Sequence, residues 1–187
     1  MGQIRHAFAS AKDDGSDASL VRPSNWNADH VGLALVRKTA ASLISTDTAL
    51  RNVYLADDPA TPLNFAMAAN EIWMFEAFFI VSGPVGADVK FAFDIPTGAT
   101  IIWEGRSLPL TGVSPWNVVL GGVIEGDQGA SNFGVIDVTT KSVIRISGMV
   151  VNGANAGPLQ PMWAQAASDG TACTLYPNSW LKGTRVA

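Results

Sequence analysis

Residues 71–81, with the sequence EIWMFEAFFIV, place apolar side chains on both faces of one predicted β-strand. A strand points successive side chains to opposite faces of its sheet. Odd-numbered positions from Trp73 to Val81 are all apolar, and even-numbered positions from Ile72 to Ile80 are apolar except for Glu76. One face can therefore fill the core of a sandwich. The second face of the strand also has to be covered by apolar groups. Antiparallel strands normally expose one face to water, and that face is then polar rather than apolar.

Two hypotheses account for the second apolar face. A loop or a second layer of the same chain could cover it, or a symmetric oligomer could pack on the sheet, since large exposed apolar patches mark interfaces. The oligomer is the preferred hypothesis, but the sequence does not reveal which face points inward, because strand register is not visible in it. Glu76 is predicted to lie at a rim or to pair with Arg145, since a buried carboxylate needs a partner.

The chain after residue 70 alternates short apolar stretches with turn residues and has almost no helix signals. In residues 88–95, apolar side chains alternate with Asp, Lys and Ala, which is typical of a half-buried strand. Similar stretches, among them the predicted strands over residues 133–139 and 142–151, recur at roughly 8- to 12-residue spacing, a pattern typical of β-sandwiches and jelly rolls. Residues 33–36 are a further short candidate strand. We therefore predict an all-β fold, an antiparallel jelly-roll sandwich, in a head domain that spans residues 39–187.

The first 38 residues differ from the rest of the chain. They are rich in Asp, Asn and Ser, residues 1–32 show no hydrophobic periodicity, and Pro23 blocks a regular strand ladder. Such a segment buries too little surface to fold alone. Its isolated aromatic residues, Phe8 and Trp26, suit contacts with a partner. We predict that residues 1–38 form an extended N-terminal arm laid along another protein.

Composition argues against several classes of function. Charged residues make up 15% of the chain and the net charge is −4, whereas nucleic-acid binding needs clustered Lys and Arg. The N-terminal region holds no apolar run typical of a signal peptide or membrane helix, so no membrane partner is expected. The single cysteine, Cys173, is predicted to be a small buried hydrophobe.

No catalytic, metal or cofactor site is predicted. The two histidines, His6 and His30, both lie in the arm, and structural zinc needs three or four Cys or His ligands. Residues 13–17, DDGSD, resemble a calcium loop only superficially, because the downstream Glu is missing, and we interpret them as a solvated turn. The chain is therefore expected to be a non-enzymatic protein.

Four segments follow one another along the head: residues 63–66 (LNFA), 88–91 (DVKF), 146–153 (ISGMVVNG) and 178–181 (NSWL). This succession resembles the trimeric jelly-roll head shared by the tumour necrosis factor family and the globular head of complement component one, subunit q. It resembles the jelly-roll heads of bacteriophage virion proteins in particular. The resemblance covers residues 39–186 and implies a homotrimer. The residues expected in its core or at its threefold interface are Trp73, Phe75, Phe78, Phe79 and Trp163.

Residues 5–8 (RHAF) and 18–30 (ASLVRPSNWNADH) resemble the leading segments of other phage structural proteins. The resemblance implies an anchoring arm, in which Phe8, Arg22, Pro23 and Trp26 attach the head to the major capsid protein or another virion protein. The implied function is a capsid decoration or cement protein, or a short head-fibre trimer. Such a protein is made in the host cytoplasm and ends on the capsid surface of the virion.

An alternative function stays open at this point. The head could be the receptor-binding module of a phage fibre or tail, and its tip could bind a host surface glycan. Exposed Trp103, Trp116 and Trp180 would suit stacking on sugar rings, although core packing is the commoner role of such residues. Fold alone does not decide between these functions.

Overall fold

The computed structural model describes residues 32–53, 62–108, 117–125 and 129–187, and within these ranges every helix or strand is a β-strand. The predicted all-β fold class is therefore confirmed. The strands are β1 (Leu33–Arg37), β2 (Ser42–Ile44), β3 (Arg51–Asn52), β4 (Phe65–Met67), β5 (Ile72–Ser82), β6 (Val89–Asp94), β7 (Thr100–Ser107), β8 (Asn117–Glu125), β9 (Ser131–Phe133), β10 (Ser142–Val151), β11 (Gly157–Gln165), β12 (Cys173–Leu175) and β13 (Trp180–Arg185).

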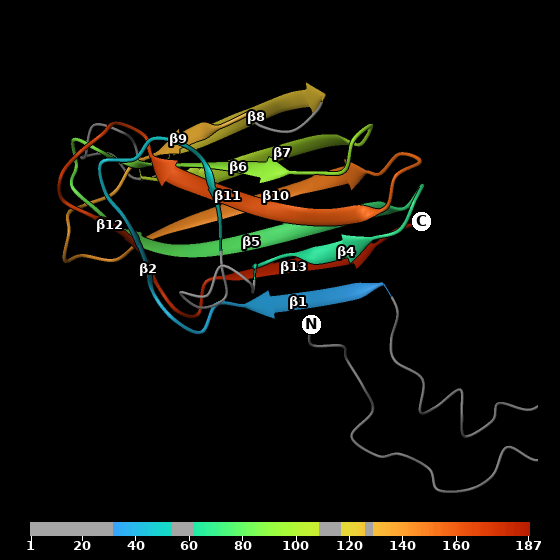
Figure 1. Ribbon diagram of the computed structural model, residues 1–187, viewed down its shortest axis with the longest axis horizontal. Helices are drawn as coiled ribbons and strands as arrows, with labels where there is room; N and C mark the ends of the chain where they lie inside the picture. The colour runs from blue at the N-terminus through green and yellow to red at the C-terminus, as the bar shows by residue number, and fades with distance from the viewer. Residues whose placement is uncertain (1–31, 54–61, 109–116, 126–128) are drawn as a thin grey trace, which may run out of the picture.

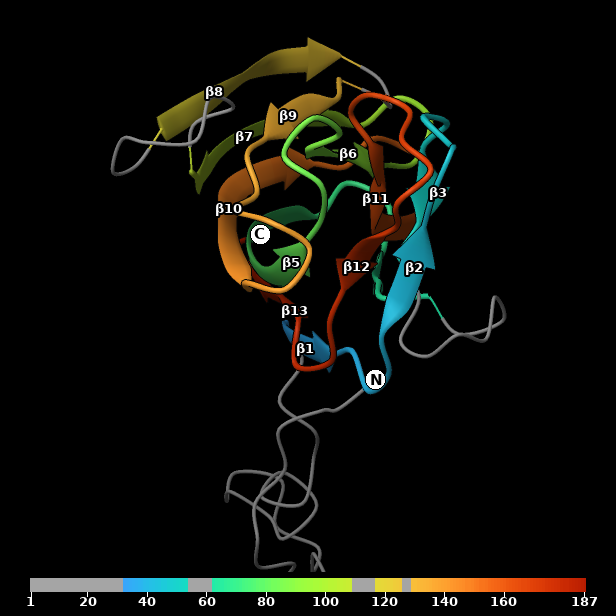
Figure 2. The ribbon, with the colours of Figure 1, turned by 90° about the vertical axis from the view of Figure 1, so that its left-hand side faces the viewer.

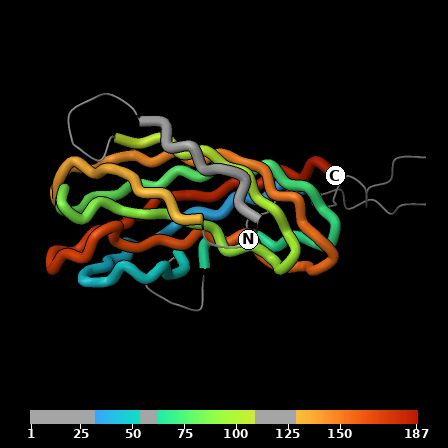
Figure 3. The backbone as a smooth tube through the Cα atoms, turned by 90° about the horizontal axis from the view of Figure 1, so that it is seen from above, coloured from blue at the N-terminus to red at the C-terminus, as the bar shows by residue number. Residues whose placement is uncertain are grey.

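These strands form two antiparallel sheets that face each other as a sandwich (Figure 1). The large sheet has eight strands in the order β1-β13-β5-β10-β7-β8, and β12 and β2 join it beside the end of β5. The small sheet has five strands in the order β3-β11-β6-β9, and β4 pairs with β11. Figure 2 shows the large sheet curving as an arc from β8 to β1 around the small sheet. Figure 3 shows the strands of both sheets running along the long axis.

Aromatic side chains of the two sheets interlock in the core. The ring of Phe79 on β5 stacks on that of Phe91 on β6, with centroids 4.4 Å apart, and Phe75 meets Phe93 edge-on at 4.8 Å. Trp103 on β7 packs against Phe93 from the other side. Burial of each such ring contributes about 1.5–3 kcal/mol to stability. The β5–β6 aromatic contacts therefore join the sheets at their centre.

Three glycines on the inner face of the large sheet make room for these rings. A Cβ on Gly148 would lie 2.4 Å from the carbonyl oxygen of Ile102 and 2.8 Å from Cε1 of Phe75. A Cβ on Gly105 would meet the ring of Phe133, and one on Gly183 the ring of Phe65, at 2.5 Å in both cases. These closely packed positions need glycine because no space is left for a side chain.

Residues 33–38, which precede the predicted boundary between arm and head, pack as part of the sandwich. Residues 33–37 form β1 and pair along their whole length with β13, from Leu33 opposite Thr184 to Arg37 opposite Trp180. Ala34 and Val36 point into the core and are buried. The strand predicted over residues 33–36 is therefore confirmed, and its partner is a distant part of the chain. The sandwich therefore includes residues 33–38, while residues 1–31 lie outside the described part of the chain.

The start of the sandwich and the C-terminus lie at the same end (Figure 1). The carbonyl of Gly32 accepts a hydrogen bond from the N–H of Arg185, and that of Ala187 accepts one from Ile72. The β5–β6 and β11–β12 connections lie at the opposite end, where the N–H of Ala167 donates to the carbonyl of Ala87. The long strands thus separate the point where the chain enters the head from these two connections.

Candidate functional site

The outer face of the large sheet is the candidate site, because there the second apolar face of β5 meets no other layer in the described residues. Even-numbered β5 residues point to this face, and Met74 is 58% exposed. Odd-numbered residues point inward and are buried. The two-faced character predicted from the sequence is therefore confirmed, and the inward face is the one with Trp73, Phe75 and Phe79.

Strand register arranges the outer face in three transverse rows. The apolar row runs through neighbouring strands as Met74, Met149 and Ile102, and all three side chains are exposed. Leu33 and Thr184 extend this row towards β1. A groove of about 690 Å³ lies over the three apolar residues. This row supplies exposed apolar surface of the kind that marks interfaces.

The middle row carries the charges of the face. Glu76 forms an ion pair with Lys182 at 3.1 Å, and both side chains are about half exposed. This pairing corrects the alternative in which Arg145 is the partner of Glu76: Lys182 lies directly opposite Glu76 on β13. Glu104 accepts from Ser147 Oγ at 3.4 Å and pairs with Arg106 at the same distance. Exposed pairs such as these contribute at most about 1 kcal/mol each.

The third row, which we call the aromatic–arginine patch, consists of Arg37, Trp180, Phe78, Arg145 and Arg106 on five adjacent strands. The rings of Trp180 and Phe78 are stacked, with centroids 5.9 Å apart and planes 6° from parallel. The guanidinium of Arg145 lies over the Phe78 ring, 5.5 Å from its centroid. A groove of about 480 Å³ runs beside the patch, and Glu76, Glu104 and Ser147 also line it. Stacked rings with a cation on one face form a rigid, partly exposed platform.

The predicted interface residues divide between two places. Trp73, Phe75, Phe79 and Trp163 are buried in the sandwich, whereas Phe78 is half-buried on the outer face. Of the tryptophans considered for sugar stacking, Trp103 is buried against Phe93 and Phe133, so it cannot stack on a ligand. Trp180 lies on the outer face. Trp116 and the predicted arm residues Phe8, Arg22, Pro23 and Trp26 lie outside the described residues.

Sequence reasoning missed the cationic residues of the outer face. Three of them, Arg37, Arg106 and Lys182, occupy outward-pointing positions of their strands. The sequence shows no cluster because these residues are far apart along the chain. Only the strand order brings them together. The one available signal in the sequence was the alternation of side chains along each strand, which assigns each of these cations to the outward face.

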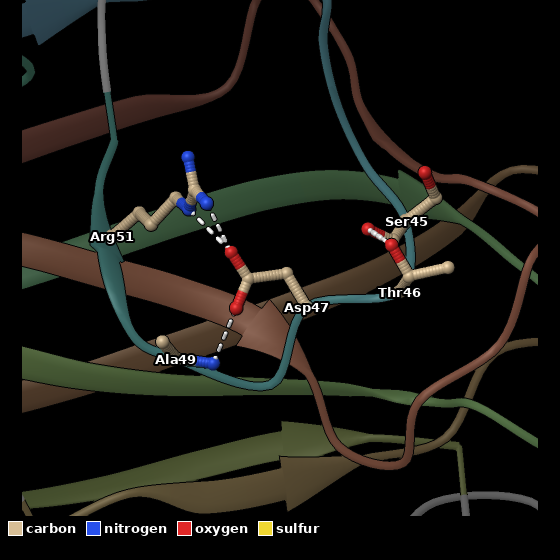
Figure 4. A network of polar contacts seen from close by, with 5 residues as sticks. All are labelled: Ser45, Thr46, Asp47, Ala49 and Arg51. Carbon is tan, nitrogen blue, oxygen red and sulfur yellow. Dashed lines mark hydrogen bonds and ion pairs between the residues drawn. The ribbon is translucent and has the colours of Figure 1, made fainter.

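One polar network away from the outer face, around Asp47, is a structural contact. In Figure 4 the carboxylate of Asp47 accepts from the backbone N–H of Ala49 at 2.7 Å and from Nε of Arg51 at 2.7 Å. The Ala49 N–H and then the Arg51 guanidinium lower the pKa of Asp47 below its usual value. This network stabilises the connection between β2 and β3. The carboxylate of Asp47 is fully engaged in it, so we do not consider Asp47 a catalytic candidate.

Cys173 is buried, as predicted, and its thiol donates to the carbonyl of Asp88 at 3.5 Å. Burial raises the pKa of the thiol to about 11, so little thiolate exists at neutral pH. Across residues 32–53, 62–108, 117–125 and 129–187, no group of three or more His, Cys, Asp or Glu is placed to hold a metal ion. The same ranges contain no helix long and apolar enough to cross a membrane. His6, His30 and residues 13–17 fall outside them.

No protein-family model and no curated protein matches this chain. One solved structure similar to it is the VP2 subviral particle of infectious bursal disease virus, with 8% sequence identity and a TM-score of 0.21. The alignment covers 91% of this chain and 44% of the VP2 chain, so this chain spans less than half of that protein's length. A likeness this weak carries no argument about fold or function.

Proposed function

We propose that this chain is a non-enzymatic structural protein of a virion, whose head assembles as a homotrimer through the apolar row on the outer face of its large sheet. Residues 1–31 would attach the trimer to the capsid surface as a decoration or cement protein, or as a short head fibre. The observation that carries the assembly is the exposed apolar row of Met74, Met149 and Ile102. Three adjacent strands contribute to it, so it forms one continuous strip rather than isolated exposed residues.

The strand order supports the jelly-roll part of this proposal. The first strand, β1, and the last, β13, lie side by side with β5 and β10 in one sheet, while β11 and β6 are neighbours in the other. Strands close in sequence thus alternate between the two sheets, which is typical of jelly rolls. The β7–β8 hairpin extends the large sheet beyond this pattern.

The attachment and the virion rest on the sequence resemblance of residues 5–8 and 18–30 to the leading segments of phage structural proteins. One geometric feature fits the proposal: β1 follows the segment directly and lies along the edge of the large sheet. A segment that leaves the head at one end can reach a surface without crossing the outer face.

Light scattering at micromolar concentration tests the assembly, with an expected mass of three chains. Ile102→Lys should reduce that mass towards one chain while the circular-dichroism spectrum stays unchanged, because Ile102 is 46% exposed in the isolated head. Val85→Lys is the matched control: Val85 is also 46% exposed but lies in the β5–β6 connection. A wild-type mass of one chain would refute the trimer.

A deletion of residues 1–31 tests attachment. It keeps Gly32, whose carbonyl accepts from Arg185, so the head should fold and assemble as before. The shortened protein should no longer join virus particles, and Trp26→Ala in the full chain should weaken binding without lowering the stability of the head. Normal decoration by the shortened head would show that the arm is not the anchor.

A further inference from the structure

The aromatic–arginine patch has features that assembly through the apolar row does not use. Met74 and Phe78 are four residues apart on β5, so the two rows lie about 13 Å from each other. Trp180 and Phe78 offer a flat, partly exposed aromatic surface, and polar side chains surround it. The patch therefore combines one apolar face with several hydrogen-bonding groups, as ligand sites commonly do.

Arg145 is the cation available to a ligand. Within the described residues no carboxylate lies in ion-pair distance of its guanidinium, which contacts the Phe78 ring instead. The other cations of the region have partners: Arg106 pairs with Glu104, Lys182 with Glu76, and Arg37 donates to Asn178 Oδ1. A guanidinium that lies over an aromatic ring still has its N–H donors available in one plane. It can therefore donate two parallel hydrogen bonds to a carboxylate.

The same groove presents acceptors. Glu76 and Glu104 line it together with Ser147, and their oxygens can accept from hydroxyl groups. A ligand that suits the rings, the carboxylates and Arg145 together needs three features. It has a flat apolar face to stack on the rings, many hydroxyl groups to donate to the carboxylates, and one acidic group to bind Arg145. A sugar ring with a carboxylate meets this description.

We propose that the aromatic–arginine patch binds a carboxylate-bearing carbohydrate, with a sugar ring on Trp180 and its carboxylate on Arg145. A nucleic acid fits less well, although its bases also stack on aromatic rings. Its repeated phosphates would meet Glu76 and Glu104 in the same groove, and the chain has a net charge of −4. This site does not depend on the proposed assembly, because no residue of the apolar row belongs to the patch.

Isothermal titration calorimetry of the full chain tests the proposal. The acidic probes are oligosaccharides of galacturonic acid, and sialyllactose. The neutral probes are galactose oligosaccharides and lactose, and a short oligothymidylate represents nucleic acid. At millimolar ligand, we expect at least one acidic sugar to bind roughly tenfold or more tightly than its neutral counterpart, because charge-assisted hydrogen bonds to a guanidinium are strong.

Arg145→Met keeps the apolar stem over Phe78 but removes the charge, and it should abolish the preference for the acidic sugar. Arg106→Met provides a second variant next to it, with a smaller loss expected. Arg51→Met is the matched control, because Arg51 is an exposed arginine of the small sheet, paired with Asp47. Melting temperatures close to wild type establish that each variant is folded.

Three results would overturn the proposal: no acidic sugar binds better than its neutral counterpart, Arg145→Met binds the acidic sugar as wild type does, or oligothymidylate binds more tightly than every sugar. Light scattering on the same samples separates this site from the assembly. Ile102→Lys should change the mass and keep sugar binding, whereas Arg145→Met should change sugar binding and keep the mass.

Discussion

The replacement of Gly148 by alanine tests whether the aromatic core is as tightly interlocked as the structure indicates. Gly148 lies on β10 between Phe75 and Trp103, opposite both in the strand register. The new Cβ would lie 2.4 Å from the carbonyl oxygen of Ile102 and 2.7 Å from Cβ of Trp103. Ordinary contact begins at 3.4 Å, so the backbone of β7 would have to move by about 1 Å.

The magnitude follows from two opposing effects. Overpacking a core costs roughly 1–3 kcal/mol, and the upper end applies because the nearest atoms belong to backbone and Cβ rather than to a flexible side-chain end. Replacing glycine by alanine also restricts the unfolded chain, which returns about 0.4–1 kcal/mol. We therefore expect Gly148→Ala to lower the free energy of unfolding by about 2 kcal/mol.

Urea unfolding followed by tryptophan fluorescence measures this change, at one fixed protein concentration because the proposed assembly would make stability concentration-dependent. With a typical urea dependence of roughly 2 kcal/mol per molar, the midpoint should fall by about 1 M. Gly86→Ala is the matched control, since a Cβ there meets nothing within 4 Å. If the two variants unfold at the same urea concentration, the close packing inferred around Gly148 is wrong.

Three further predictions use other features of the sandwich. Phe75→Asp should prevent folding, because Phe75 is 2% exposed, whereas Phe78→Asp should leave the circular-dichroism spectrum unchanged because Phe78 lies on the outer face. Burial raises the pKa of the Cys173 thiol to about 11, so the thiol should react with a thiol reagent at pH 8 only upon unfolding; reaction in the native state would contradict this. The contribution of the buried thiol to stability should be lost as pH rises from 9.0, the value for the unfolded chain, through 11. Burial also raises the pKa of Asp88, so its charge opposes folding at neutral pH. Asp88→Asn keeps an acceptor for the N–H of Val135 and should raise the urea midpoint at pH 7, with the gain vanishing below pH 3.8; a lower midpoint at pH 7 would count against it.

The sequence predicted the long strands well because their side-chain alternation is strong. The predicted strand over residues 142–151 coincides with β10, and that over 71–81 differs from β5 by one residue at each end. The short strand β4 was missed for a physical reason. β4 has three residues, too few to show a period, and it is stabilised by pairing with Pro158 and its neighbours on β11.

Turn chemistry explains another miss. Residues 133–139 were predicted to be a strand, but β9 ends at Phe133. Asp137 accepts hydrogen bonds from the backbone N–H groups of Thr139 and Thr140, and these bonds bend the chain away from a sheet. The β-branched residues of this segment suggested a strand, and the carboxylate overrode that propensity.

The candidate site could be predicted only in part. The sequence located the second apolar face of β5, but the neighbours of that face come from β13, β10 and β7, whose order along the sheet no local pattern reveals. The fates of Trp103 and Trp180 illustrate this. Both stand in β-strands, yet Trp103 fills the core and Trp180 lies on the outer face, because register decides the face.

The start of β1 and the C-terminus lie at one end of the sandwich, which makes the opposite end suitable for carrying foreign peptides. β5 has 11 residues, so its ends are about 35 Å apart, and the connections at its far end include Gly86 and Gly170, which have open space around them. An epitope inserted at either glycine would lie at the end of the sandwich opposite Gly32 and leave both the outer face and the core untouched. A tag fused after Ala187 would instead lie beside Gly32 and crowd whatever the preceding segment binds.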